Sequence, residues 1–265
     1  MFAIDATTIN LCLSTFYWAV FRSTKSGIRL HTQLNLKTAI PAFILFTNAD
    51  VHEVNALDII LFEANSFYIM DRGYVDYRRL YKIHCCKAFF ITRAKNNMNF
   101  GRLYSHAVDK SKGVLCDQTI LLRGYYAAKD YPEKMRRIKF RDHETGKTFI
   151  FLTNNFHLAA TDIARLYKNR WKIELFFKWI KQHLKIKSFW GQSENAVKTQ
   201  IWIAVSVYVL IAIAKKKFML QQSLYEILQI FSISVFERIP INQLFQQTRL
   251  QYFKEQNSNQ LNIFD

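Results

Sequence analysis

The order of strand-like and helix-like segments in the first 92 residues is the feature that most constrains the fold of this chain. The segment "FAID" at residues 2–5 is strand-like and ends at an aspartate, Asp5. "GIRLHTQL" then alternates apolar and polar residues, as a half-buried strand does, and "AIPAFILF" follows the turn "NLKT". Residues 28–46 therefore predict a β-hairpin.

Two further strands and two helices are expected between this hairpin and Thr92. "HEVNALDIILF" carries apolar residues at helical spacing, whereas "SFYIM" (66–70) and "AFFIT" (88–92) are short apolar strands. The order strand, strand, strand, helix, strand, helix, strand predicts a mixed sheet with a right-handed helical crossover between Phe46 and Phe67. The first and fourth strands should then be parallel neighbours.

Asp5 and Asp71 each follow one of these two neighbouring strands. In α/β sheets, ligands bind at the carboxyl ends of parallel strands, so the two carboxylates should lie close together at a ligand site. For either aspartate alone, a cap or a turn is the ordinary role. Only the pair of acids on adjacent strands raises the question of a metal site.

The remainder of the chain divides into a β-rich part and a helical part. "QTILL", "RRIKFRD" and "KTFIFLT" are strand-like, and "DHETGK" between the last two is typical of a hairpin turn. Residues 95–159 are therefore predicted to be a β-rich insertion. After Thr161 the sequence predicts helices near residues 161–187, 194–217 and 223–236.

The segment "YKNRWKIELFFKWIK" places one acid, Glu174, among basic residues. Six residues gather on or near one face of a continuous helix at about 100° per residue: Tyr167, Arg170, Glu174, Lys178, Lys181 and Lys185. Two interpretations stay open from this pattern alone. Glu174 could form a surface ion pair with Arg170 or Lys178, worth roughly 0.3–0.5 kcal/mol, or it could bind a metal beside bases that hold phosphates.

The net charge of +17 points to nucleic acid or an anionic membrane surface as the partner. From Arg165 to Lys217, twelve lysines and arginines stand against two glutamates. The apolar run at 201–214 has 14 residues, whereas a membrane-spanning helix needs roughly 20. We therefore expect a soluble protein with no membrane partner. Its four cysteines match no zinc-binding spacing and are expected to be reduced thiols.

The spacing of Tyr167, Arg170, Glu174 and Lys181 is similar to the Y-(2)-R-(3)-E-(6)-K signature of bacterial insertion-sequence transposases of the insertion-sequence-four family. "FAIDATTINLCLS" resembles the stretch around the first catalytic aspartate of that family, and "MDRGYVDYRRLY" resembles the stretch around the second. "FFKWIKQHLKIKSFWGQSENAVKTQIWIAV" resembles the block that follows the glutamate. These blocks have the family's order across most of the chain.

The resemblance implies a ribonuclease-H-like α/β fold, in which helices flank a mixed sheet and a β-rich insertion precedes the helix of the catalytic glutamate. Three acids would be the catalytic metal ligands: Asp5, Asp71 and Glu174. Five residues would bind DNA: Tyr167, Arg170, Lys178, Lys181 and Lys185. The implied cofactor is Mg²⁺ or Mn²⁺, with two ions per site. The implied reaction is cleavage of a DNA strand followed by transfer of that strand.

One catalytic domain is expected over residues 1–265. It would comprise a core at 1–94 and 160–220, the insertion at 95–159 and a helical tail at 221–265. Only four residues precede Asp5, so the region in which this family recognises transposon ends is expected to be missing. The implied partners are double-stranded DNA, as transposon ends and target, and a second copy of the chain on that DNA. The implied location is the bacterial cytoplasm, at the nucleoid.

Two alternatives stay open from the sequence. The first is an inactive, truncated transposase remnant that binds DNA with a steep salt dependence and cuts nothing. The second is another ribonuclease-H-like nuclease, such as a junction resolvase, which would cut branched DNA without strand transfer. Metal-dependent nicking separates the first alternative from an enzyme.

Overall fold

The computed structural model describes residues 1–184, 186, 188–234, 236–241 and 243–245. The chain separates into two compact units, Met1–Ser206 and Val207–Asp265. The first unit contains a ten-stranded sheet. Its strands are β1 (Phe2–Leu11), β2 (Val20–Arg22), β3 (Lys25–Asn35), β4 (Ile40–Asn48), β5 (Phe67–Met70), β6 (Phe89–Arg93), β7 (Phe100–Ser105), β8 (Val114–Leu122), β9 (Met135–Arg141) and β10 (Thr148–Thr153).

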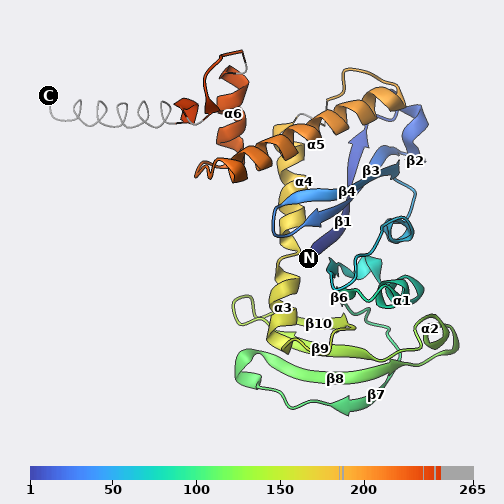
Figure 1. The fold of residues 1–265 in the computed structure, drawn as a ribbon. Coiled ribbons are helices and arrows are strands. Elements are labelled where there is room, and N and C mark those ends of the chain that lie inside the picture. The colour runs from blue at the N-terminus through green and yellow to red at the C-terminus, as the bar shows by residue number, and fades with distance from the viewer. Residues whose placement is uncertain (185, 187, 235, 242, 246–265) are drawn as a thin grey trace. The chain divides into compact units, whose positions relative to one another are not determined.

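Helices and short 3₁₀ turns alternate with these strands and follow them along the chain (Figure 1). The α-helices are α1 (Tyr77–Cys85), α2 (Tyr125–Asp130), α3 (Ala160–Lys168), α4 (Trp171–His183), α5 (Glu194–Lys217) and α6 (Leu224–Ser234). The 3₁₀ turns are η1 (Tyr17–Ala19), η2 (Glu53–Asp58), η3 (Arg72–Tyr74) and η4 (Lys110–Lys112). In Figure 1, α4 lies against β1, and α3 lies near the strands of the β-rich part.

The sheet is mixed, as the order of segments predicts, with strand order β2-β3-β1-β5-β6-β10-β9-β8-β7 and β4 paired with β3. β3 and β4 form the predicted hairpin. β1 pairs in parallel with β5, with Ile4 opposite Met70, and β5 pairs in parallel with β6. The first and fourth predicted strands are therefore parallel neighbours. β7 to β10 precede the helix of Glu174, and they continue the same sheet because β10 pairs with β6.

The alternation of side chains along β1 places Asp5 on the face opposite the hydrophobic core. Ile4, Tyr68 and Met70 belong to a core cluster with Leu57 of η2 and Leu80 of α1, and all five are fully buried. Successive side chains of a strand point to opposite faces, so Asp5 points away from this core. α4 packs on β1, and Arg170, in the turn before α4, meets Asp5 on that side.

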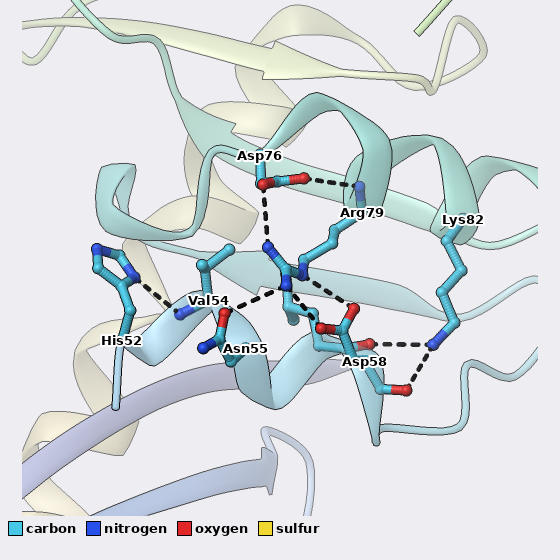
Figure 2. A network of polar contacts seen from close by, with 8 residues as sticks. His52, Val54, Asn55, Asp58, Asp76, Arg79 and Lys82 are labelled. Atoms are coloured by element: carbon cyan, nitrogen blue, oxygen red, sulfur yellow. Dashed lines mark hydrogen bonds and ion pairs between the residues drawn. The ribbon is translucent and has the colours of Figure 1, made fainter. Parts of the chain in front are cut away.

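A network of polar contacts holds η2 against α1 (Figure 2). The Arg79 guanidinium donates to Asp58 at 2.9 and 2.6 Å and to Asn55 at 3.2 Å, and Lys82 Nζ donates to the Asp58 carbonyl at 2.9 Å. His52 caps η2 by accepting from Val54 N. The helix expected here is a shorter 3₁₀ turn, fixed by side chains of α1.

The single helix predicted at 161–187 is wrong in one respect, because the chain turns between α3 and α4. Asn169 N donates to the Leu166 carbonyl and Arg170 N donates to the Tyr167 carbonyl, both three residues back. The Asn169 side chain donates to the Arg165 carbonyl at 3.2 Å, so it competes with the helical bonding pattern. Side chains from Tyr167 to Lys181 therefore do not lie on one continuous helix.

α5 extends the apolar run at 201–214 to a helix of 24 residues. Among the described residues it is the one helix long and apolar enough to cross a membrane, by length and composition alone. The core helix of a protein without a membrane passes the same test, and part of the apolar stretch of α5 is buried inside the protein. The length of the apolar run is therefore a weaker argument against a membrane-spanning helix than the sequence alone indicates.

Candidate active site

Arg170 links the first and third predicted catalytic acids. Its Nη1 lies 3.1 Å from Asp5 Oδ2, and its Nη2 forms an ion pair with Glu174 Oε1. Asp5 lies within β1 and Glu174 is one turn into α4. Arg170, 165 positions after Asp5, meets both of them here. The side chains of Arg170 and Asp5 are 19 % and 15 % exposed, which makes this contact far less solvated than a surface pair.

The turn between α3 and α4 puts Arg170 in this place. Arg170 precedes the first residue of α4, and its guanidinium lies 5.9 Å from the ring centroid of Tyr167, the buried residue near the end of α3. Tyr167 packs on Phe151 of β10, with ring centroids 4.9 Å apart. Aromatic rings packed on the sheet therefore support the arginine that bridges the two acids.

Asp71 directly follows β5, at the level of Asp5 on the neighbouring strand. Its Oδ1 accepts from Gly73 N at 2.7 Å, which caps η3, and its carbonyl accepts from the buried Thr92 hydroxyl at 2.8 Å. The cap role expected of a lone aspartate is thus present. It uses one carboxylate oxygen, and Oδ2 has no hydrogen bond to any residue that the structure describes.

The electrostatics of Asp5 report several acids close together. Burial raises the pKa of Asp5 to about 7, and the carboxylates of Asp71 and Glu53 also favour this rise, against a hydrogen bond from Ala6 N and the charge of Arg170. Carboxylates that lie near one another disfavour one another's ionisation. A cation placed among them would relieve this repulsion.

Sequence reasoning missed Glu53 and Tyr74. Glu53 opens η2, lies 3.9 Å from Arg29 Nε and has a pKa raised by burial, with Asp71 adding to the rise. Tyr74 is fully buried, its hydroxyl has no hydrogen-bond partner among the described residues, and burial together with the charges of Asp5, Glu53 and Asp71 raises its pKa. Glu53 stands first in a helical pattern, where acids are common, so the sequence carried no distinguishing signal.

The predicted basic residues separate into three groups. Lys181 Nζ donates to Thr7 Oγ1 at 2.6 Å and to the Thr8 carbonyl at 2.9 Å, so it is fixed on β1 near Asp5. Lys178 is exposed on α4. Lys185 lies outside the described residues. The structure thus brings Arg170 and Lys181 to β1, whereas Tyr167 packs on Phe151 of β10.

The donor set has the chemistry for a divalent cation, because carboxylate oxygens are the ligands that Mg²⁺ prefers. Among the described residues, however, no group of three metal-binding side chains is close enough to hold an ion as the chain stands. The Arg170 guanidinium lies between Asp5 and Glu174. Entry of a cation between these acids therefore requires the Arg170 side chain to move.

The raised pKa of Asp5 predicts a pH-dependent stability in the presence of a chelator. In the unfolded chain Asp5 ionises near 3.8, whereas in the folded protein it ionises near 7. The folded state then binds more protons between these values, so stability falls as pH rises from about 4 to 7, by an amount on the order of 4 kcal/mol. Asp5→Asn should remove this fall. Urea unfolding of both proteins at pH 5 and pH 8 checks it, and equal pH slopes would contradict it.

Comparisons with known proteins show the family and the fold. Residues 1–210 match the family described as "Transposase DDE domain". A solved structure with a similar fold is the piggyBac transposase in a synaptic complex with hairpin DNA. The likeness has a TM-score of 0.53 at 8 % identity, and it covers 93 % of this chain and 56 % of that one.

Several curated relatives align with most of the chain. A putative transposase of Sinorhizobium fredii, y4zB, is 36 % identical over 80 % of this chain and 60 % of its own length. A probable transposase for the insertion sequence element IS5377 of Geobacillus stearothermophilus is 29 % identical over 78 % of this chain and 55 % of its own length. The chain thus spans little more than half of these relatives, and by the family match and these identities it belongs to the bacterial insertion-sequence transposases with a DDE domain.

Proposed function

We propose that the chain catalyses metal-dependent cleavage of a DNA strand and transfer of that strand for an insertion sequence, with Asp5, Asp71 and Glu174 as the catalytic acids. The observation that carries the proposal is the Arg170 bridge, which ties an acid of β1 to an acid of α4 beside the end of β5. Because the same guanidinium also pairs with Asp5, the pair with Glu174 is not an isolated surface ion pair.

Asp5, Asp71 and Glu174 would hold the divalent ions, Mg²⁺ or Mn²⁺, two per site. When bound, such ions activate the attacking oxygen and stabilise the leaving oxygen of an in-line displacement. The protein itself needs no Ser, Cys or His nucleophile, since phosphoryl transfer is mostly positioning and charge neutralisation. The raised pKa of Asp5 means that the fold alone does not fully favour its charged form near neutral pH.

Residues of the chain would orient the DNA around these acids. Arg170 pairs with Asp5 and Glu174, and its displacement would free a bidentate donor for a phosphate. Lys181 is fixed on β1 and presents its charge near Thr7 and Thr8. Lys178, exposed on α4, and Lys185 would bind phosphates further along the strand.

The partners follow from the family and are proposals here. We propose that the chain binds double-stranded DNA, both as transposon ends and as target, and that it forms a homodimer on that DNA. We also propose that it is located in the bacterial cytoplasm, at the nucleoid. The solved piggyBac transposase was seen with hairpin DNA, and the charge of +17 suits such a partner. We also propose the core at 1–94 and 160–220, the insertion at 95–159 and the tail at 221–265 as working parts of one catalytic domain.

A cleavage assay tests the function. Supercoiled DNA that carries the sequences flanking this gene would be incubated with the chain and Mg²⁺, Mn²⁺ or a chelator. We expect nicking with free 3′-hydroxyl ends and joined products in either metal, and none with the chelator. DNA binding without nicking in any metal would favour the second candidate, a remnant that occupies DNA. Nicking of branched DNA alone, without joined products, would favour a resolvase.

A further inference from the structure

A basic cavity lies next to the candidate active site, and the proposed chemistry does not use it. Its volume is about 160 Å³. The wall is formed by η3, the end of β6 with the segment after it, the start of β7, β9 and β10. Six of its residues bear on ligand binding: Arg72, Arg93, Lys95, Phe100, Arg137 and Phe149.

Every charged side chain that lines the cavity is a cation. Arg72, Arg93 and Lys95 form no ion pair with any acid that the structure describes, and Arg137 donates to neutral groups, to Gln118 Oε1 at 3.0 Å and Cys116 Sγ at 3.4 Å. Cations gathered around one hollow repel each other, and a bound anion would relieve that repulsion.

Aromatic rings hold two of the guanidinium groups in place. Arg93 lies 5.4 Å from the ring centroid of Phe149, and Arg137 lies 5.0 Å from that of Phe100. Such cation–π contacts fix a side chain without neutralising its charge. The donors are therefore pre-positioned at the wall, with their positive charge available to a ligand.

Two residues that line the cavity are next to Asp71 or to its hydrogen-bond partner in the chain. Arg72 directly follows Asp71 in the chain, and Thr92, beside Arg93, donates to the Asp71 carbonyl. Burial raises the pKa of Tyr167, and the charges of Arg170 and Arg93 oppose that rise. Arg93 also stands opposite Phe151 in the sheet, and Phe151 packs on Tyr167, the ring that supports the arginine between Asp5 and Glu174.

We propose that this cavity binds a phosphodiester of the DNA strand that runs past Asp71, a contact beyond those assigned to α4. The inference rests on the proposed function for the identity of its ligand. The size suits a phosphate with part of its sugar. Planar guanidinium groups match phosphate oxygens in pairs, and the apolar rings would pack on the sugar. A free phosphate or pyrophosphate has the same chemistry and is separated by the test.

The test measures binding without cleavage. Fluorescence anisotropy with a labelled duplex, in a chelator, would give the dissociation constant over a range of salt. Three proteins are compared: the full chain, Arg93→Gln/Lys95→Gln, and the charge-matched control Lys87→Gln/Lys110→Gln. Lys87 precedes the far end of β6 and Lys110 lies in η4; both are exposed, and neither pairs with a described acid.

We expect the cavity variant to bind DNA about tenfold more weakly and its slope of log K against log salt to fall by about 0.9 for each phosphate that it no longer contacts. The control should change less than half as much in both quantities. Equal changes in both variants, or no DNA binding by the full chain, would overturn the inference. Thermal stabilisation by inorganic pyrophosphate that vanishes in the cavity variant, with an unchanged DNA slope, would overturn it too, in favour of a free anion.

This binding test and the cleavage assay can fail separately. A chain that nicks DNA but shows no cavity effect keeps the proposed function and contradicts this inference. If the chain nicks no DNA but the cavity variant has a reduced salt slope, the inference stands. The cavity then binds DNA in a protein that does not cut it.

Discussion

Replacing Asp117 with alanine is expected to destabilise the protein by about 3–5 kcal/mol, because it would leave the charge of Arg136 buried and unpaired. The two side chains are 7 % and 8 % exposed. Arg136 Nε and Nη2 donate to the Asp117 oxygens at 2.9 and 2.6 Å, a bidentate pair between β8 and β9. Its Nη1 donates to the Leu158 carbonyl at 2.6 Å. The arginine thus also anchors the segment that leads into α3.

The control for this prediction is an exposed pair. Glu194 and Lys198 pair on α5 with exposures of 51 % and 37 %, and Glu194→Ala should cost less than about 1 kcal/mol. Urea unfolding followed by circular dichroism measures both. Hydrogen exchange at α3 should also rise in Asp117→Ala, since Leu158 precedes that helix. A cost below about 1 kcal/mol for Asp117→Ala would mean that water reaches the pair in solution.

The fold was predictable where periodicity and order carry the information. The parallel pairing of β1 with β5 followed from the sequence of strands and a right-handed crossover, and α5 has the predicted bounds. The reach of β1 to Leu11 was missed, because Thr7, Thr8 and Asn10 are polar and its pairing with β3 decides the length. The break before α4 was missed because it depends on one side chain, Asn169, bonding to the backbone.

The candidate site was predictable only in part. The parallel pairing of β1 with β5 places Asp5 and Asp71 at the same level, although Asp5 lies inside β1 and only Asp71 follows its strand. Glu53 joins them because the Arg79 network holds η2 on α1, a contact that no local pattern reveals. The role of Arg170 was expected toward DNA, whereas in the structure it faces two acids. Arg170 and Asp5 meet in a largely buried place. The hydropathy pattern along a chain does not show which charged side chains will share such a place.

The two interpretations of Glu174 now make different predictions. An ion pair with Arg170 four residues earlier does exist, so the simple interpretation of a helix-stabilising pair is geometrically present. That interpretation predicts a loss of roughly 0.3–0.5 kcal/mol on removal of the charge and no effect on DNA chemistry. The pair is not isolated, however, because the same guanidinium holds Asp5. A measurement of DNA cleavage separates the two interpretations of Glu174.

Glu174→Gln should therefore leave folding and DNA binding nearly unchanged and abolish metal-dependent nicking. A ligand that helps stabilise several kcal/mol of transition-state charge is worth on the order of 10³-fold in rate. The substitution keeps size and removes charge, so it does not disturb the packing of α4. Glu133→Gln, an exposed carboxylate on the segment before β9, is the matched control and should nick at the rate of the unaltered chain. Nicking by Glu174→Gln within about threefold of that rate would assign Glu174 to the helix surface and leave the two aspartates to be explained without it.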